Sequence, residues 1–303
     1  TTREAVWNLG QNSAGIAVRF RSDSPVIAVK WENTFNNSMK HMAPVGIKGL
    51  DLYCFIDGKW RFVNSAQPSG KTNQWQIISG MDATEREYML YLPLYDGIHS
   101  LQIGVAAPSH IGQPSLPYPD TRKPIVFYGS SITQGACASR PGMAATNLIG
   151  RKLNVETINL GFSGNAFIDY EVAEMMAHVD ASAYVPNASP EQILEKTEKF
   201  VRILREKHPD VPLIFVEDPI FPHSKFDLRM AKEIKDKNDA MNQAFSSLKK
   251  QGLKKIYLVK GRSLISANGE STVDGIHFTD CGFEQYVDAI LPILKKAINH
   301  KKK

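Results

Sequence analysis

The sequence has few cysteines and no long apolar run, and these two absences exclude several classes of protein. Three cysteines are too few for a disulfide-stabilised scaffold and their spacing matches no zinc site, so we expect buried apolar thiols at Cys54, Cys137 and Cys281. No apolar stretch approaches the roughly 20 residues of a membrane-spanning helix, so no transmembrane segment is predicted.

Signals for nucleic acids, phosphates and metals are also missing. Part of the net charge of +5 comes from the lysines at 301–303, which we interpret as a solvated end of the chain. No basic patch is interleaved with aromatic residues, so nucleic acid is not an expected partner. Because the sequence has no glycine-rich phosphate loop and no cluster of metal ligands, we expect neither a cofactor nor a metal site.

The remaining composition is that of an ordinary globular protein, with 43% hydrophobic and 22% charged residues. A length of 303 residues suits one large domain or two ordinary ones. The chain begins with Thr1-Thr2 rather than Met. Removal of a leader would place the protein in the periplasm or outside the cell, and a cytoplasmic location stays open.

Residues 1–121 are predicted to form an all-β domain, a sandwich or jelly roll. Short runs of alternating apolar and polar residues recur, and Asp57-Gly58 supplies a tight hairpin turn. Five prolines between residues 108 and 124 indicate an extended, stiff linker. The expected strands cover residues 16–20, 25–31, 52–56, 60–63, 86–92 and 98–105.

Residues 122–303 show a different pattern, in which short apolar runs alternate with amphipathic segments. This alternation predicts a flavodoxin-like, three-layer α/β/α domain with a parallel five-stranded sheet. The expected strands are 125–128, 155–158, 183–185, 212–216 and 255–259, and the expected helices are 143–153, 190–207, 228–250 and 280–299.

Polar blocks follow four of these strands. Parallel strands bring their carboxyl ends to one edge of a sheet, so residues far apart in sequence can meet there. Ser131 follows the first strand, Gly164 the second, Asn187 the third, and Asp274 with His277 the fifth.

In this order, Gly-x-Ser, Gly, Asn and Asp-x-x-His resemble the four blocks of the SGNH (GDSL-type) hydrolases, over roughly residues 124–300. The segment Gly49-Leu-Asp-Leu-Tyr53 also looks like the signature of the GxDLY-type β-domain that precedes one bacterial branch of these enzymes. Together with Cys137-Ala-Ser-Arg-Pro-Gly142, it indicates that two-domain branch.

The resemblance implies a cofactor-free serine esterase with a triad of Ser131, His277 and Asp274. Ser131 would attack the ester, His277 would move the proton, and Asp274 would orient the imidazole. Backbone N–H groups of Ser131 and Gly164 and the side-chain amide of Asn187 would form the oxyanion hole. Ser130 stands where the family motif usually has Asp, which leaves Ser130 as the alternative nucleophile.

The third block departs most from the family pattern. The strand at 183–185 runs directly into Pro186-Asn187, where several more residues are expected. Either this loop is truncated or residues are missing between Val185 and Pro186. Candidate substrate-binding residues near the same sheet edge are Arg140, Asn165, Glu217 and Glu270, and a solvated loop charge is an equal alternative for the charged ones.

The expected substrate is a small-molecule or polysaccharide ester with a short acyl group, because the attached β-domain favours an acetylated carbohydrate. A lipid- or arylester-type GDSL esterase and an acyltransferase would use the same residues. A catalytically inactive carbohydrate-binding protein is the alternative from a different class. The oligomeric state stays open.

Overall fold

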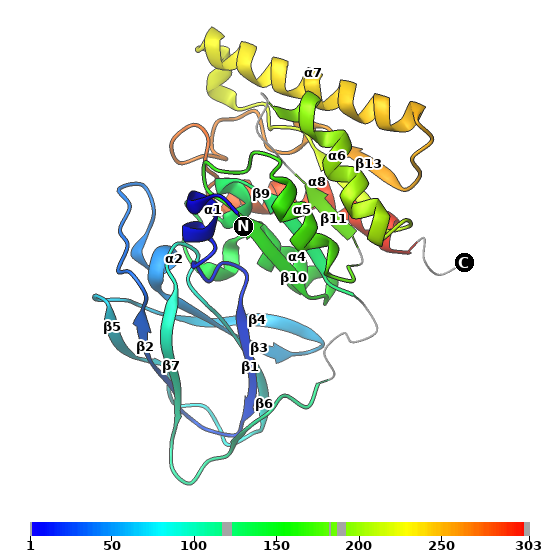
Figure 1. The fold of residues 1–303 in the computed structure, drawn as a ribbon. Coiled ribbons are helices and arrows are strands. Elements are labelled where there is room, and N and C mark those ends of the chain that lie inside the picture. Colours follow the sequence, from blue (N-terminus) through cyan, green and yellow to red (C-terminus); the bar gives the residue numbers. More distant parts are fainter. Residues whose placement is uncertain (1, 117–122, 182, 187–191, 300–303) are drawn as a thin grey trace.

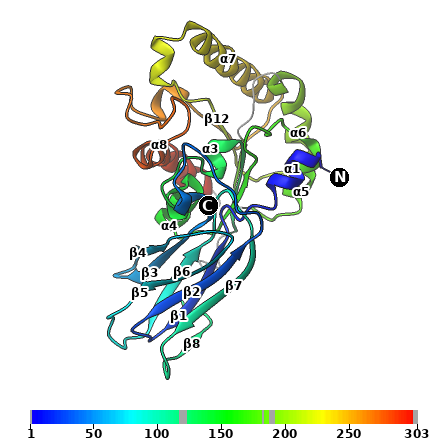
Figure 2. The ribbon, with the colours of Figure 1, turned by 90° about the vertical axis from the view of Figure 1, so that its left-hand side faces the viewer.

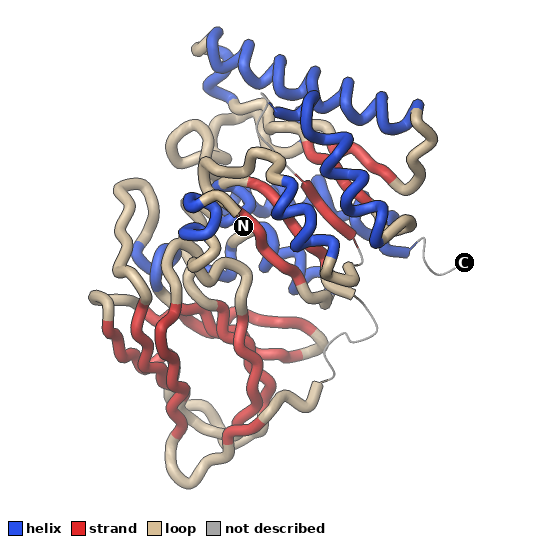
Figure 3. Tube along the Cα trace, viewed as in Figure 1, coloured by secondary structure: helices blue, strands red, loops and turns tan. Residues whose placement is uncertain are grey.

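The two halves of the chain form a β-domain and an α/β domain that lie against each other (Figure 1). The computed structural model describes residues 2–116, 123–181, 183–186 and 192–299. Strands and loops make up most of the β-domain, whereas helices surround the sheet of the α/β domain (Figure 3). The predicted order, an N-terminal β-domain followed by a mixed α/β domain, is confirmed. No helix in the described ranges is long and apolar enough to cross a membrane.

The β-domain consists of two sheets with a shared apolar core. One sheet has the order β4-β3-β6-β1-β8 and the other the order β5-β2-β7. Trp31, Leu52 and Tyr88 are buried between them. The strands are β1 (Ala17–Ser22), β2 (Ile27–Asn33), β3 (Leu50–Ile56), β4 (Lys59–Ala66), β5 (Thr72–Ile78), β6 (Arg86–Tyr91), β7 (Ile98–Val105) and β8 (Ile111–Gly112).

Two of these strands, β5 and β8, were not predicted. β8 lies inside the stretch interpreted as a linker, and that interpretation is wrong for its first part. Ile111 and Gly112 pair with Ser22 and Arg21 of β1 at the edge of the sheet. An edge position tolerates the neighbouring prolines, because only one side of the strand has to supply hydrogen bonds.

The α/β domain contains a five-stranded sheet of order β10-β9-β11-β12-β13, in which every neighbouring pair is parallel. The strands are β9 (Ile125–Gly129), β10 (Thr157–Gly161), β11 (Ala183–Pro186), β12 (Leu213–Val216) and β13 (Ile256–Val259). The helices are α3 (Ser131–Gln134), α4 (Ala145–Leu153), α5 (Tyr170–Ala177), α6 (Ile193–Lys207), α7 (Leu228–Lys250) and α8 (Asp280–Asn299), with short 3₁₀ turns η1 (Pro141–Met143), η3 (Pro222–Lys225) and η4 (Gly261–Ser263).

Successive side chains of the central strand β9 point alternately into two apolar layers. Ile125 and Phe127 of β9 pack in the cluster that contains α4 and α8, whereas Val126 and Tyr128 pack in the cluster of α5 and α6. Successive strand residues point to opposite faces of a sheet, so a strand buried on both sides must be apolar throughout. This explains why residues 125–128 form an unbroken apolar run.

The hydrophobic cores of the α/β domain include residues from both sides of the predicted domain boundary. Val6 of α1 (Glu4–Leu9) packs in the α5/α6 layer, and Figures 1 and 2 show α1 beside α5. Ile47 of α2 (Pro44–Lys48), together with Leu94 and Tyr95, belongs to the layer of α4 and α8. Segments of the N-terminal half therefore complete the core of the α/β domain.

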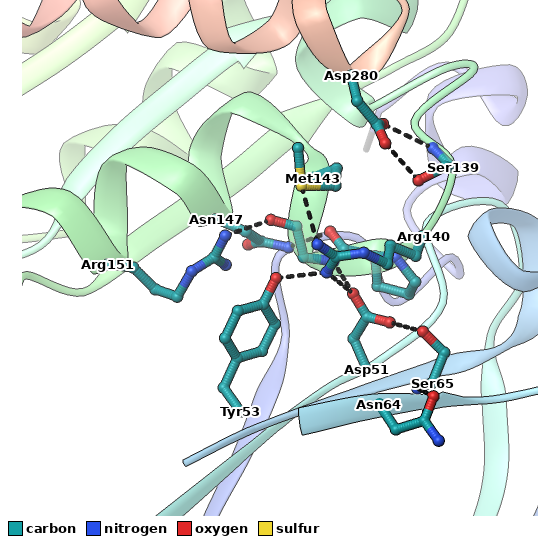
Figure 4. Close-up of polar contacts among 12 residues, drawn as sticks. Asp51, Tyr53, Asn64, Ser65, Ser139, Arg140, Met143, Asn147, Arg151 and Asp280 are labelled. Atoms are coloured by element: carbon teal, nitrogen blue, oxygen red, sulfur yellow. Dashed lines mark hydrogen bonds and ion pairs between the residues drawn. The ribbon is translucent and has the colours of Figure 1, made fainter. Parts of the chain in front are cut away.

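A buried carboxylate fastens the β-domain to the loop after the α3 helix (Figure 4). Asp51 is fully buried, and its Oδ2 accepts hydrogen bonds from Arg140 Nη1 and the Gly142 backbone N–H, both at 2.8 Å. Its Oδ1 accepts a bond from Ser65 Oγ at 2.6 Å. Arg140 Nη1 also donates to the Tyr53 hydroxyl at 2.5 Å. Asp51 and Tyr53 of the Gly49–Tyr53 signature are thus residues of the domain junction.

We expect Asp51→Ala to lower the free energy of unfolding by about 3–5 kcal/mol, because it leaves the partly buried Arg140 and the Gly142 N–H without their partner. Urea denaturation followed by circular dichroism measures this change. The matched control is Glu85→Ala, which removes the half-exposed ion pair with Arg21 and should cost less than about 1 kcal/mol. Equal losses in the two variants would contradict the role given to Asp51.

Candidate active site

The nucleophile candidate sits where the central strand turns into a short helix. β9 ends at Gly129, and Ser131 is the first residue of α3. The Gln134 backbone N–H donates to the Ser130 carbonyl at 3.0 Å, and Gly135 ends the helix with φ of 109°, a conformation that favours glycine. This strand–turn–helix geometry presents Ser131 at the carboxyl edge of the sheet.

The structure brings Ser131, His277 and Asp274 together. His277 Nε2 lies 2.9 Å from Ser131 Oγ, and His277 Nδ1 lies 2.7 Å from Asp274 Oδ2. Asp274 Oδ1 also accepts bonds from the backbone N–H groups of His277 at 2.8 Å and Ile276 at 3.1 Å. Both ring nitrogens of the imidazole therefore have a partner, one on each side.

These hydrogen bonds set the protonation of Asp274. Partial burial alone would raise the pKa of this carboxyl, but the bonds from the His277 ring and from the His277 and Ile276 N–H groups outweigh it and lower the pKa to about 2. Asp274 is consequently ionised at neutral pH, the state in which it can hold Nδ1–H and stabilise an imidazolium.

The predicted oxyanion donors are only partly described. Gly164 lies in an exposed loop after β10 with φ of +67°, and a Cβ added there would meet nothing within 4 Å. The preceding Ser163 N–H donates to Gln134 Oε1 at 3.0 Å, so the α3 helix holds this loop. Asn187, the third predicted donor, lies outside the described residues.

Tyr95 of the β-domain contacts both the Gly164 loop and the turn that carries Ser131. Its hydroxyl lies 3.2 Å from Ser163 Oγ and 3.4 Å from the Ser131 carbonyl oxygen. Burial raises the pKa of Tyr95, so the hydroxyl stays protonated and remains a donor. The buried Gln134 also donates to the Leu94 carbonyl at 3.1 Å.

A cavity of about 140 Å³ is lined in part by Ser131 and its neighbours Ser130 and Ile132. Its apolar walls include Pro219, Phe221, Met230 and Ile276. A polar wall carries Asp218, whose Oδ2 lies 3.3 Å from Lys237 Nζ. A cavity of roughly 150 Å³ can admit a group the size of benzene, so this space suits a short acyl chain.

Both halves of the chain match families of known proteins. Residues 122–295 match the GDSL-like lipase/acylhydrolase family, and residues 1–111 match the N-terminal domain of SGNH-hydrolase-type esterases. The protein belongs to the GDSL-like lipase/acylhydrolase family. A comparison with curated protein sequences gave no match.

Solved structures support the membership. A GDSL-like lipase from Bacteroides ovatus is 40% identical, with a TM-score of 0.94, and the match covers 99% of this chain and 89% of that one. Two more distant structures share the fold. The salicylyl-acyltransferase SsfX3 of a tetracycline biosynthetic pathway has a TM-score of 0.74 at 17% identity, over 95% of this chain and 84% of that chain. A family two carbohydrate esterase from Clostridium thermocellum has a TM-score of 0.65 at 12% identity, over 95% and 94%.

Two of the candidate substrate residues have structural partners in this GDSL-family protein. Glu217 is buried, and its carboxylate accepts bonds from Lys260 Nζ at 3.0 Å, Asn242 Nδ2 at 2.8 Å and the Gly261 N–H at 2.8 Å. These contacts give Glu217 a structural role, and its role as a substrate contact stays a prediction. Arg140 is held by the domain junction and stacks on the Phe62 ring, 3.8 Å from its centroid, so its observed contacts are structural.

The other two candidates stay predictions. Asn165 is half-buried in the Gly164 loop; it accepts a bond from Arg3 Nη1 at 3.3 Å and donates to the Ser163 carbonyl at 3.1 Å. Glu270 is exposed in the loop that precedes the Asp274–His277 block.

Two residues near the triad were not predicted as site residues. The His41 ring, from a loop of the β-domain, lies 5.5 Å from the His277 ring between centroids, and the Cys137 thiol faces the same place. Burial raises the pKa of the Cys137 thiol to about 11, so it is protonated at neutral pH. Burial of Cys54 and Cys137 agrees with the prediction, but Cys281 is exposed, and the prediction of a buried thiol there is wrong.

We expect Asp274→Asn to change the pH dependence of stability. The pKa of this carboxyl is lower in the folded protein than the roughly 3.9 of an unfolded chain. Its stabilising contribution is therefore fully present above about pH 4 and is lost as the pH falls toward 2. The difference in Tm between wild type and Asp274→Asn should shrink over that interval.

The matched control is Glu270→Gln, because the Glu270 carboxyl is exposed in the preceding loop. Its Tm difference from wild type should not follow the same pH course. A Tm difference for Asp274→Asn that stays constant from pH 5 to pH 2 would show that the carboxylate is not held as described.

Proposed function

We propose that the protein is a serine esterase that hydrolyses short acyl esters. The observation that carries the proposal is the position of the His277 imidazole, with Nε2 2.9 Å from Ser131 Oγ and Nδ1 2.7 Å from the ionised Asp274. This arrangement fits a general base that is oriented by a carboxylate and aimed at a hydroxyl.

In the proposed reaction, Ser131 Oγ attacks the ester carbonyl carbon while His277 Nε2 takes the hydroxyl proton. The negative charge on the carbonyl oxygen would be met by the Ser131 and Gly164 N–H groups and by the Asn187 amide. His277 then gives its proton to the leaving alcohol, and an acyl group remains on Ser131. A water molecule, activated by the same imidazole, releases the acid and restores Ser131.

The cavity beside Ser131 is the proposed acyl pocket. Its volume of about 140 Å³ suits acetyl and slightly longer chains, and its lining includes Phe221, which precedes η3, and Met230 in the first turn of α7. Long-chain lipid acyl groups would have to extend beyond it.

The alcohol is proposed to be a carbohydrate. The surface around the three residues is open and carries polar groups: the Asp274 side chain is 35% exposed, and His41 and Glu270 are exposed. Val273 and Ile276 are exposed beside them and add apolar surface. Polar groups next to apolar patches suit the hydroxyl groups and C–H faces of a sugar, and a polysaccharide ester would fit a periplasmic or extracellular protein. An inactive carbohydrate-binding protein would not need the assembled triad, whereas acyl transfer to another alcohol would use the same acyl-enzyme.

We expect Ser131→Ala to reduce kcat/KM for p-nitrophenyl acetate by at least about 10³-fold, because it removes the hydroxyl that lies beside His277 Nε2. Ser130→Ala is the matched control and should retain activity within about tenfold, since the hydroxyl 2.9 Å from His277 Nε2 is that of Ser131. The measurement is the initial rate of ester hydrolysis by wild type and both variants, with the folding of each variant checked by circular dichroism. Full activity in Ser131→Ala would overturn the triad, and loss in Ser130→Ala alone would move the nucleophile by one residue.

The acyl pocket predicts a chain-length profile. Hydrolysis of p-nitrophenyl acetate and butyrate should exceed that of the octanoate, and Met230→Ala should raise kcat/KM for the hexanoate relative to the acetate by about tenfold, because the shortened side chain makes room for additional methylenes. Met175→Ala, on the exposed face of α5, is the control and should keep the wild-type ratio. An unchanged profile in Met230→Ala would place the acyl group elsewhere.

A further inference from the structure

Four potential metal ligands meet at the open side of the triad. One ligand atom from each of His41, Cys137, Asp274 and His277 lies within 4.8 Å of all the others. We propose that these residues form a binding site for a borderline-soft divalent metal such as Zn²⁺, and that the bound metal switches the enzyme off. The binding part stands on the cluster alone, whereas the inhibition rests on the proposed esterase function.

The chemical types of the four ligand atoms determine which metal the site prefers. A thiolate and two imidazoles favour Zn²⁺ and similar transition metals, whereas Mg²⁺ and Ca²⁺ prefer oxygen ligands. With Zn–S near 2.3 Å and Zn–N near 2.0–2.1 Å, tetrahedral donors lie roughly 3.3–3.7 Å apart. The observed cluster therefore has to contract by about 1 Å to enclose the metal.

The side chain that can supply this movement is His41. It is exposed, and within the described part of the chain its imidazole makes no hydrogen bond, so rotation costs little. Its backbone is nevertheless fixed, because the Cys137 thiol donates to the His41 carbonyl oxygen at 3.2 Å. This contact ties the β-domain loop to the turn after α3, where Cys137 has φ of +67°. The two domains thus supply one ligand each besides the triad pair.

Metal binding and catalysis exclude each other at His277. A metal on Nε2 replaces the hydrogen bond to Ser131 Oγ, and a metal on Nδ1 replaces the bond to Asp274. In either case the imidazole loses the lone pair or the orientation that a general base requires. The Cys137 proton leaves to solvent as the thiolate binds, so no oxidant or reductant is needed.

The first test measures binding without reference to activity. Cobalt(II) is titrated into the full-length protein, and a thiolate-to-cobalt charge-transfer band is recorded in the near ultraviolet. We expect the band in wild type and in Cys281→Ser, which removes the exposed thiol outside the cluster, and its loss in Cys137→Ser. Absence of the band from wild type, or its persistence in Cys137→Ser, would overturn the site.

The second test uses the exposed ligand, whose replacement does not threaten folding. His41→Ala should weaken Zn²⁺ binding, measured by competition with a chromophoric chelator, by at least about tenfold. In the same variant, Zn²⁺ inhibition of p-nitrophenyl acetate hydrolysis should weaken by the same factor. Chelation should restore wild-type activity, and Mg²⁺ should not inhibit.

The outcomes separate the two proposals. A wild-type protein that binds cobalt through Cys137 but hydrolyses no ester would sustain the metal site and contradict the proposed function. An active esterase whose Zn²⁺ affinity is the same in wild type and His41→Ala would contradict the metal site and sustain the function. Equal inhibition by Mg²⁺ and Zn²⁺ would also overturn a site built on sulfur and nitrogen ligands.

Discussion

The hydrogen bonds of the buried Asp51 carboxylate are the interaction on which the geometry of the candidate site depends. It binds Arg140 and the Gly142 N–H in the segment that follows the α3 helix. In that segment, the Ser139 N–H and hydroxyl donate to Asp280 at 3.0 and 2.5 Å, and Asp280 begins α8 three residues after His277 (Figure 4). A continuous series of polar contacts therefore runs from a strand of the β-domain to the loop that carries the histidine. The Asp51 contacts are buried and therefore costly to break, whereas the Ser139–Asp280 bonds are exposed and contribute less.

Much of the α/β domain could be predicted from the sequence because its signals are local. The bounds of α7 and α8 agree with the helices predicted from apolar periodicity, and strong caps contribute: Asp227 accepts bonds from the first N–H groups of α7. The meeting of Ser131, His277 and Asp274 could be predicted because all three follow strands of one parallel sheet, whereas their catalytic roles stay a prediction. The helix α5 was missed, since its eight residues give too short a periodic stretch. β10 begins at Thr157, two residues later than predicted, because the segment Val155-Glu-Thr-Ile158 starts before the hydrogen-bonded ladder with β9 does.

Contacts between segments far apart in the chain could not be predicted, because no spacing in the sequence encodes them. Arg140 and Glu217 carry charges near the predicted edge of the sheet. Their partners are distant in the sequence: Asp51 lies 89 positions before Arg140, and Lys260 lies 43 positions after Glu217. Likewise His41 and Tyr95 reach the Ser131–His277 region only because the β-domain packs beside the segment that contains α3 and Cys137. A local motif identifies the groups at the ends of strands, whereas the walls of the site come from tertiary structure.

The placement of α1 and α2 has a consequence for how the protein folds. Val6 and Ile47 are buried in the two apolar layers of the α/β domain although they precede its sheet by more than 75 residues. Residues 122–303 alone would leave both layers open to water, and the β-domain alone would present apolar helices without a partner. We therefore expect the two halves to unfold as one cooperative unit, because neither apolar layer of the α/β domain is complete until α1 and α2 have packed against it.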